Sequence, residues 1–397
     1  MGNDGNRWSS PLKIGLVTPF FLPKIGGANI YCYELARALS QMGHEVHLFS
    51  VPGALEDQAY QLHPVLTKNI SQDIETLRRH QMDAWHSLFM YYAPMALHLP
   101  NVVVTVHGDD GFSFQLRYRL PGWAWLERRL LWRLPSQARA TFRRWLEQIE
   151  VRYNRRLYRR ALSRAKRVIT VSSFTRDRLS QAYPAARDKA IVIPPGVAEA
   201  FFSRGAGKHN PKRLLTVTRL DEHDRIKNVH NVIAALGILK DRYDFHYTVI
   251  SGTISGGYKD ELLGMIDSLG LTGRVSIEGR KTEAELLQHY RDAGLFILAS
   301  YAEPNNFEGF GIVFLEANAQ GTPVLTTREG GMTDYIHDGV NGLYVRDPSA
   351  NGIREALEHY WSGQVRFDPA VIEAAPQPYR WGNIAQRIAD IYEQAIA

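Results

Sequence analysis

Short apolar runs alternate with helix-length segments along almost the whole chain, and this alternation restricts the fold more than any other feature. Helical spacing of apolar residues is found over residues 30–42, 232–240, 260–269 and 283–292. The apolar composition of buried strands is found over residues 12–18, 45–51, 102–106 and 168–171, and again over 214–217, 247–250, 275–277, 295–298 and 324–326. Strands that alternate with helices form parallel, doubly wound sheets, so the sequence predicts an α/β protein.

The length of the chain predicts two such domains. A chain of 397 residues with 45% apolar content can bury two sizeable cores. The boundary between the halves is expected near residues 200–211, where residues 203–211 form a polar, Gly-rich linker. We therefore expect an N-terminal domain over residues 1–205 and a C-terminal domain over residues 206–378, followed by a helical segment over residues 379–397.

Composition indicates a cytoplasmic enzyme. Cys32 is the single cysteine, which excludes an intrachain disulfide framework and favours a reducing compartment. No run of 18 uncharged apolar residues is present, so no transmembrane helix is expected. The first eight residues lack the apolar core of a signal peptide.

Two glutamates are spaced for ligand binding. Glu308 and Glu316 are eight positions apart, and the turn Gly309-Phe310-Gly311 follows the first. If a helix begins near Gly311, both carboxylates lie near one side of it, about 80° apart. Free N–H groups at that helix start would bind phosphate while the carboxylates accept hydrogen bonds from sugar hydroxyls. The pattern suits a nucleotide sugar, although a plain buried helix is the alternative because the residues that follow Gly311 are core-like.

The residues around this pair carry a resemblance to a known family. Together with residues 321–324, 330–331, Asp334 and 338–342, the two glutamates resemble the donor-site block of the retaining nucleotide-sugar glycosyltransferases of glycosyltransferase family 4. The resemblance extends upstream to Gly26-Gly27, Arg219 and Lys227, and covers nearly the whole chain except residues 112–147. It implies the GT-B fold, in which two Rossmann-like doubly wound domains face a central cleft. It further implies that the N-terminal domain binds the acceptor, the C-terminal domain binds the donor, and the C-terminal helix crosses back to the N-terminal domain.

The resemblance implies four catalytic residues, namely His107, Arg219, Lys227 and Glu308. When neutral, His107 would bond a sugar hydroxyl or carbonyl, and when protonated it would offset leaving-group charge. A purely structural role is the alternative. Arg219 and Lys227 would neutralise the departing diphosphate without a metal. The segment between them is longer and more charged than the family pattern, so Arg225 is a candidate to share or replace one role. No cofactor and no metal are expected, since GT-B enzymes generally need no metal and the chain has no Asp-x-Asp motif.

Eight residues are implied as donor contacts. Gly27 opens a helix after the first strand and would approach a phosphate, Arg280 would flank the nucleobase, and Glu316 would hold the ribose. Ordinary turns are the alternative at Gly27 and Arg280. The full set is Gly27, Arg280, Gly309, Phe310, Gly311, Ile312, Val313 and Glu316.

A basic, Trp-rich stretch has a different character. Residues 115–167 contain sixteen Arg or Lys and three Glu, a net charge of +13 against +6 for the whole chain. Four of the eight tryptophans lie there, and Arg and Trp interleaved with Leu suit an interfacial helix. A basic helix packed on the N-terminal sheet over residues 145–166, a protein-partner surface and nucleic-acid binding are the alternatives. We favour an anionic membrane surface and no nucleic acid. The predicted membrane-facing residues are Trp123, Trp125, Arg128, Arg129, Trp132 and Arg133.

These observations lead to one expected function. The sequence predicts a retaining hexosyltransferase that uses a nucleoside-diphosphate sugar and acts on a hydroxyl of a membrane-associated lipid or cell-envelope glycan. We expect it to be cytoplasmic and peripheral on the inner face of the cytoplasmic membrane. The alternatives are a small soluble acceptor, a nucleotide-sugar epimerase or hydrolase of the same fold, and a non-catalytic glycan-binding protein. A non-catalytic glycan-binding protein would not need the intact donor-site residues.

Overall fold

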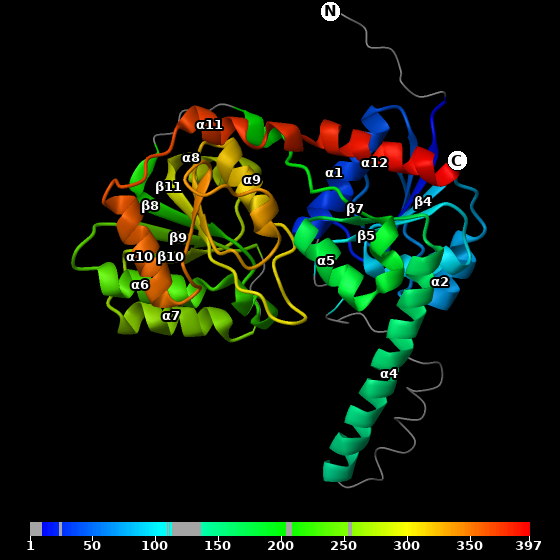
Figure 1. The fold of residues 1–397 in the computed structure, drawn as a ribbon, viewed down its shortest axis with the longest axis horizontal. Coiled ribbons are helices and arrows are strands. Elements are labelled where there is room, and N and C mark those ends of the chain that lie inside the picture. The colour runs from blue at the N-terminus through cyan, green and yellow to red at the C-terminus, as the bar shows by residue number, and fades with distance from the viewer. Residues whose placement is uncertain are drawn as a thin grey trace, which may run out of the picture.

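The computed structural model describes residues 10–23, 26–108, 110, 112, 136–203, 209–252 and 256–397. Two parallel sheets lie side by side, one in each half of the chain, and helices cover them (Figure 1). The predicted α/β fold with two Rossmann-like domains is therefore confirmed.

The described strands of the N-terminal sheet have the order β3-β2-β1-β4-β5-β6-β7. The strands are β1 (Lys13–Val17), β2 (Glu45–Phe49), β3 (Gln61–His63), β4 (Ala84–Ser87), β5 (Val102–Val106), β6 (Arg167–Thr170) and β7 (Ala190–Val192). The α-helices are α1 (Gly27–Gln41), α2 (Ile70–Leu77), α4 (Ser136–Arg164) and α5 (Ser173–Ala182). Short 3₁₀ helices are η1 (Met90–Leu97), η4 (Pro184–Lys189) and η5 (Glu199–Phe202).

The described strands of the C-terminal sheet have the order β10-β9-β8-β11-β12-β13. The strands are β8 (Asn210–Val217), β9 (His246–Ile250), β10 (Val275–Glu278), β11 (Ala293–Leu298), β12 (Val324–Thr326) and β13 (Gly342–Tyr344). The α-helices are α6 (Val229–Leu239), α7 (Tyr258–Ser268), α8 (Glu283–Asp292), α9 (Ile312–Ala319), α10 (Ala350–Trp361), α11 (Pro369–Ala374) and α12 (Trp381–Ile396). The 3₁₀ helices are η6 (Glu222–Lys227), η7 (Gly331–Asp334) and η8 (Gln377–Tyr379).

Both sheets reverse their strand order, between β1 and β4 in the first and between β8 and β11 in the second. In doubly wound sheets a ligand binds beyond the carboxyl ends of the strands at such a reversal. The segments that leave these ends carry Gly27 after β1, Arg219 and Lys227 after β8, and Glu308 after β11. In both domains, the topology therefore places predicted site residues beyond the carboxyl ends of the strands at which the strand order reverses.

Helix α12 returns to the N-terminal domain, as predicted. Figure 1 shows it running across that domain, next to α1. Its buried face, which includes Trp381, Ile388 and Tyr392, belongs to the N-terminal hydrophobic core. The hydroxyl of Tyr392 lies 2.7 Å from Nδ1 of His86 in β4, so a polar contact fixes the helix as well.

Helix α4 packs on the N-terminal domain at one end only. Tyr158, Ala161 and Leu162, near its carboxyl end, are part of the N-terminal core. Its other end projects away from the body of the molecule (Figure 1). The six residues predicted to face a membrane lie outside the described residues. In the described part of the chain, none of the helices is both long and apolar enough to cross a membrane.

Candidate active site

The segment around Gly309 lies where the two domains meet. A Cβ atom at Gly309 would lie 1.9 Å from the carbonyl oxygen of His107, and one at Gly331 would lie 1.7 Å from the carbonyl oxygen of Gly309. Both distances are far below van der Waals contact, so only glycine lets these three backbone segments approach so closely. The carbonyl of Glu308 also accepts a hydrogen bond from the Gly331 N–H at 2.9 Å. This packing places Glu308 next to the end of β5, where His107 is found.

Lys227 and Glu308 form an ion pair at this junction. The Lys227 Nζ atom lies 2.6 Å from Glu308 Oε2, and the two side chains are 15% and 13% exposed. Lys227 ends η6, which follows β8, while Glu308 comes from the loop that precedes α9. Because water screens this pair less than a surface pair, its electrostatic interaction is stronger than that of an exposed ion pair.

Arg219 is held by a buried carboxylate. Its Nη2 atom lies 2.9 Å from Oδ1 of Asp224, with the two side chains 51% and 3% exposed. Burial raises the pKa of the Asp224 carboxyl to about 6, while the nearby charges of Arg219 and Lys227 oppose this rise. Asp224 therefore orients Arg219. It also lies close enough to Lys227 for the charge of that lysine to lower the pKa of the Asp224 carboxyl.

Arg225, the alternative cation, is engaged elsewhere. Its Nε atom lies 2.7 Å from Glu222 Oε2, and Nη1 lies 3.1 Å from Glu261 Oε1. Its guanidinium also stacks over the ring of Tyr258, 4.7 Å from the centroid. These contacts hold Arg225 against α7, so Lys227 rather than Arg225 is the cation that contacts Glu308.

His107 is a neutral imidazole at physiological pH. Burial lowers its pKa to about 4. Its Nε2 atom lies 2.8 Å from the carbonyl oxygen of Leu88, and because a carbonyl only accepts, Nε2 carries the proton and Nδ1 is the acceptor. The ring of Tyr31 contacts it edge-on at 4.7 Å. Of the roles considered from the sequence, bonding to a hydroxyl fits this protonation state.

Two helices from different domains begin side by side. A Cβ atom on Gly27, the first residue of α1, would lie 3.5 Å from Cγ2 of Ile312, the first residue of α9. The preceding residues, Gly26 and Gly311, have no side chain that could cap these helices. The first N–H groups of a helix have no partner inside it and attract anions. The junction therefore offers two helix starts to a phosphate group.

Glu316 and Phe310 are both buried. Glu316 is 6% exposed, and its Oε2 accepts a hydrogen bond from the Tyr290 hydroxyl at 2.8 Å. Burial raises the pKa of the Glu316 carboxyl to about 7, and the bond from Tyr290 acts in the opposite direction. The ring of Phe310 packs against Tyr335 and Tyr379 in the C-terminal core. A ligand contact by Phe310 would therefore use its backbone.

Two further expectations concern the nucleobase and a metal. Arg280 is exposed and follows β10, the outermost strand on its side of the C-terminal sheet. Its neighbours Glu278 and Lys281 form an ion pair with a 2.7 Å separation.

Among the residues that the structure describes, no three His, Cys, Asp or Glu side chains are grouped as a metal site would require.

Asp334 joins the two domains, a contact that the sequence did not indicate. Its Oδ2 accepts a hydrogen bond from the backbone N–H of Ser173 at 2.6 Å, and its other oxygen accepts one from the Ser173 hydroxyl. Ser173 is the first residue of α5 in the N-terminal domain, whereas Asp334 ends η7 in the C-terminal domain. A carboxylate at a helix start is also stabilised by the helix dipole. The serines that open α5 are a recognisable N-cap pattern, but nothing in them identified Asp334 as a partner.

Two family models match the chain, one over each half. The model described as Glycosyltransferase Family 4 matches residues 25–201, and the one described as Glycosyl transferases group 1 matches residues 198–377. The chain is 26% identical to the D-inositol 3-phosphate glycosyltransferase of Paenarthrobacter aurescens, over 94% of both chains. It is also 26% identical to the GDP-mannose-dependent alpha-(1-6)-phosphatidylinositol monomannoside mannosyltransferase of Mycobacterium tuberculosis, over 95% of this chain and 97% of that protein.

Solved structures share the fold. Sucrose-phosphate synthase from Thermosynechococcus elongatus superposes with a TM-score of 0.70 at 18% identity, covering 96% of this chain and 98% of that one. Anabaena HepE in complex with UDP and glucose superposes with a TM-score of 0.68 at 18% identity, again covering 96% and 98%. The two structures thus share the two-domain GT-B fold with this chain. Because family models match both of its halves, the chain belongs to the glycosyltransferase family 4-like enzymes.

Proposed function

We propose that the protein is a retaining hexosyltransferase that uses a nucleoside-diphosphate sugar. The observation that carries this proposal is the shielded ion pair of Lys227 and Glu308 beside the start of α9. Glu308 accepts hydrogen bonds from the hydroxyls of the transferred sugar. Lys227 and Arg219 stabilise the negative charge that develops on the departing diphosphate.

The donor lies across the junction in this proposal. Its diphosphate binds at the starts of α1 and α9, where uncapped N–H groups favour an anion. Glu316 holds the ribose and Arg280 flanks the base. A relative named for its dependence on GDP-mannose and a structural neighbour in complex with UDP and glucose support a nucleotide sugar as the donor.

The chemistry is a substitution at the anomeric carbon. The acceptor oxygen forms a bond to C1 while the bond from C1 to the β-phosphate oxygen breaks, and the bonding electron pair leaves with the phosphate. The acceptor's hydroxyl proton passes to an oxygen of that departing phosphate. Attack from the same face as departure retains the α configuration. Because Arg219, Lys227 and the helix starts supply positive charge, this scheme uses no metal.

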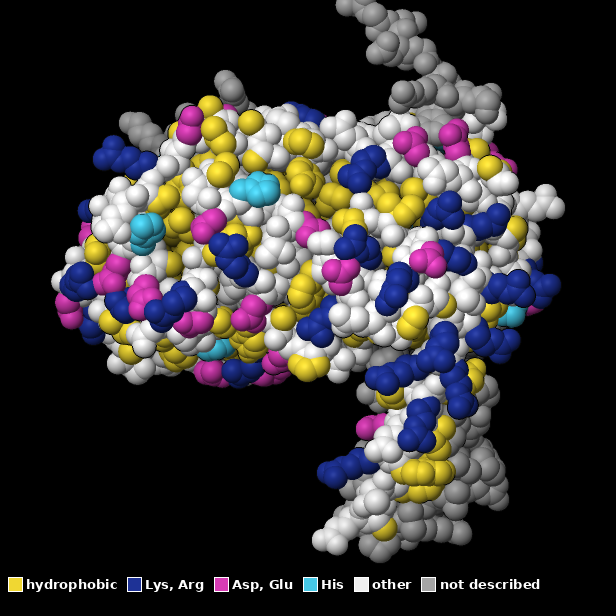
Figure 2. Space-filling view, viewed as in Figure 1, with side chains coloured by type: hydrophobic (Ala, Val, Ile, Leu, Met, Phe, Trp, Pro, Cys, Tyr) yellow, Lys and Arg dark blue, Asp and Glu magenta, His cyan; other side chains and the backbone are white. Residues whose placement is uncertain are grey.

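The proposed acceptor is a lipid or cell-envelope glycan at the inner face of the cytoplasmic membrane. The projecting part of α4 supports this choice, since Trp145 is 53% exposed and Tyr153 is 41% exposed. Figure 2 shows basic and hydrophobic side chains next to each other along this helix. Aromatic rings favour the depth of lipid headgroups, and arginines are attracted to anionic lipids.

A donor screen tests the chemistry. The protein is incubated with UDP-, GDP- and ADP-hexoses and a membrane lipid extract, with and without EDTA, and products are identified by mass spectrometry and NMR. We expect one donor to be consumed at the same rate with EDTA, with an α-linked product. A requirement for a divalent ion would overturn the metal-free scheme, and a β-linked product would overturn retention. An epimerised nucleotide sugar would identify an epimerase instead.

A further inference from the structure

The two connections between the domains lie side by side and form a hinge, which consists of Gly196-Val197 and Tyr379-Arg380-Trp381. The N–H of Val197 donates a hydrogen bond to the carbonyl oxygen of Tyr379 at 2.9 Å. A Cβ atom on Gly196 would lie 2.6 Å from Cδ2 of Trp381, so only glycine lets the first connection lie against this indole. Val197 and Trp381 belong to different hydrophobic cores, Val197 to one in the C-terminal domain and Trp381 to that of the N-terminal domain. The hinge therefore reaches into both cores.

On the N-terminal side, a single aromatic ring connects the hinge to His107. The indole of Trp381 lies 5.2 Å from the ring of Tyr31 in α1, and the ring of Tyr31 lies 4.7 Å from the imidazole of His107. Both contacts are edge-on, and the side chains of Tyr31 and Trp381 are 1% and 4% exposed. Because protein interiors are close-packed, such rings do not shift without displacing their neighbours. The orientation of the His107 imidazole thus depends on the hinge.

On the C-terminal side, the hinge contacts the donor segment, residues 308–310. The ring of Tyr379 lies 6.0 Å from that of Phe310. Phe310 follows Gly309, where an added Cβ atom would lie only 1.9 Å from the carbonyl oxygen of His107. The contacts that leave His107 through the hinge therefore return to it through the donor segment. The members of this aromatic circuit are His107, Tyr31, Trp381, Tyr379 and Phe310.

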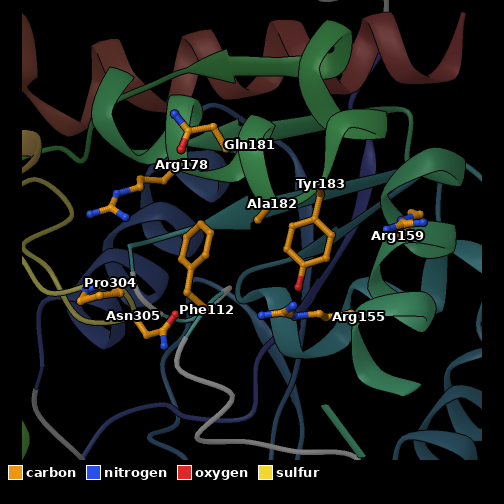
Figure 3. Close-up of a pocket in the computed structure, with 9 residues that line it drawn as sticks. All are labelled: Phe112, Arg155, Arg159, Arg178, Gln181, Ala182, Tyr183, Pro304 and Asn305. Atoms are coloured by element: carbon orange, nitrogen blue, oxygen red, sulfur yellow. The ribbon is translucent and has the colours of Figure 1, made fainter. Parts of the chain in front are cut away.

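Another part of the domain junction is hollow. A cavity of about 400 Å³ lies between α4 and α5 of the N-terminal domain and Pro304 and Asn305 of the C-terminal domain. In Figure 3, these two residues lie on one side of Phe112 and the guanidinium of Arg155 lies on the other. None of the described residues that line the cavity belongs to the hinge. The domains are therefore packed ring against ring at the hinge and more loosely at the cavity, so the hinge side fixes His107 relative to the donor segment.

We propose that three residues of the aromatic circuit hold His107 against the donor segment during glycosyl transfer. These positioning residues are Tyr31, Trp381 and Tyr379. The inference rests on the proposed transfer, in which the neutral imidazole of His107 accepts a hydrogen bond from a sugar hydroxyl. A displacement of about 1 Å in such a group can lower the rate about a hundredfold. The proposed base and ribose contacts belong to the C-terminal domain, so nucleotide affinity should not depend on the three positioning residues.

Paired substitutions in the full-length chain test this inference. Trp381→Leu and Tyr31→Leu each remove a ring and should lower kcat roughly tenfold to a hundredfold, while the Kd values of UDP and GDP stay at those of the wild type. Trp381→Phe and Tyr31→Phe keep an aromatic ring and should recover most of the lost kcat. Tyr379 is only half-buried, so Tyr379→Leu should fold even where a fully buried substitution does not. It should lower kcat in the same way.

Trp85→Leu is the matched control. Trp85 is 1% exposed, and its indole lies 5.4 Å from the ring of Phe49. It pairs with Val102, the first residue of β5, whereas His107 follows the last residue of that strand. Trp85→Leu should therefore lower Tm while kcat and the Kd values of UDP and GDP stay at those of the wild type. Equal kcat losses in Trp85→Leu and Trp381→Leu, or no recovery in Trp381→Phe, would overturn the inference.

The pKa of His107 supplies a second readout, which needs no turnover. Burial holds this pKa at about 4, below the ordinary value of 6.5. Hydrogen–deuterium exchange at the imidazole C2 position, followed by mass spectrometry across a range of pH, measures it for a single histidine. Opening the aromatic circuit admits water to the imidazole, so Tyr31→Leu and Trp381→Leu should raise the pKa of His107 towards 6.5. The two Phe variants and Trp85→Leu should leave it unchanged.

The two readouts separate this inference from the proposed function. An unchanged pKa of His107 in both Tyr31→Leu and Trp381→Leu would overturn the positioning role. A wild-type protein that consumes no donor would overturn the proposed transfer. A raised pKa in the two Leu variants, without such a rise in Trp85→Leu, would even then support the placement of His107 by the hinge.

Discussion

At the scale of single residues, the charges at the domain junction are already oriented by the protein. Lys227 contacts Glu308, and Arg219 is held by Asp224. Groups that are in place before the reaction do not need to reorganise as charge develops. The resemblance to glycosyltransferase family 4 implied Lys227, Arg219 and Glu308 as catalytic residues. It did not predict which carboxylate meets which cation, because those partners come from loops far apart in the chain.

The first prediction separates Lys227 from Arg225. Lys227→Ala should lower the rate of donor turnover by roughly two to three decades, since losing one preorganised charge at a developing oxyanion costs about 3–4 kcal/mol. Glu308→Gln should lower it by roughly one to two decades, since a charged hydrogen bond contributes about 1.5–3 kcal/mol. Arg225→Ala should leave kcat/KM near that of the wild type, because its contacts are with Glu222 and Glu261. A silent Lys227→Ala with an inactive Arg225→Ala would assign the role to Arg225.

The second prediction uses the pKa of Glu316. Because burial raises that pKa to about 7, the folded state holds a proton that the unfolded state releases near the ordinary value of 4.5. The stabilisation associated with the protonated carboxyl is fully present below pH 4.5 and is lost as the pH rises through about 7. Glu316→Gln keeps a neutral group beside Tyr290, so its Tm relative to that of the wild type should rise between pH 5 and pH 8. Thermal unfolding across this range measures the difference, and a constant Tm offset would contradict the raised pKa.

The same variant should weaken nucleotide binding if Glu316 holds the ribose.

At the scale of elements, the sequence predicted strands with a clear apolar run, and β5 and β11 are the plainest cases. Every residue of β5 and β11 is buried, so their apolar runs were visible without knowledge of the fold. Strand β4 was not predicted, because its residues Ala84-Trp85-His86-Ser87 mix apolar and polar types. His86 is accommodated there by Thr105 and Tyr392, which lie 2.7 Å from its two ring nitrogens. Such tertiary contacts cannot be read from local composition.

The third prediction concerns α4 as a membrane-binding element. Replacing Trp145 and Tyr153 by Ser should reduce cosedimentation with phosphatidylglycerol vesicles, because exposed aromatic rings then no longer insert at headgroup depth. High salt should weaken wild-type binding, since exposed charges are screened within about 10 Å at 0.1 M ionic strength. As a control, Ile238→Ser with Leu263→Ser removes hydrophobic side chains that are 54% and 43% exposed in the C-terminal domain, and it should bind like the wild type. Equal binding by all three proteins would exclude Trp145 and Tyr153 of α4 as the membrane contact.

At the scale of the whole molecule, the sequence predicted the two sheets and the returning helix but not how the domains contact each other. The pattern of α12 was clear because its apolar residues follow helical spacing over the whole element. The junction depends instead on close backbone approaches at Gly309 and Gly331 and on the carboxylate of Asp334. A lone glycine or aspartate in a loop does not identify its partner in another domain, so these contacts became visible only in three dimensions.

The last prediction concerns the contact between Asp334 and the start of α5. Asp334→Asn keeps the size of the side chain but removes the charge that accepts hydrogen bonds from Ser173. A charged hydrogen bond contributes about 1.5–3 kcal/mol, so the population with joined domains should fall by roughly one to two decades relative to the separated one. Hydrogen exchange should accelerate at the first residues of α5 and around Gly309, and kcat should fall while UDP and GDP still bind to the C-terminal domain. Asp177→Asn, on the exposed surface of the same helix, should change neither measurement. If Asp334→Asn matches the wild type in both exchange and kcat, the backbone packing of Gly309 and Gly331 alone holds the domains together, and Asp334 is dispensable for catalysis.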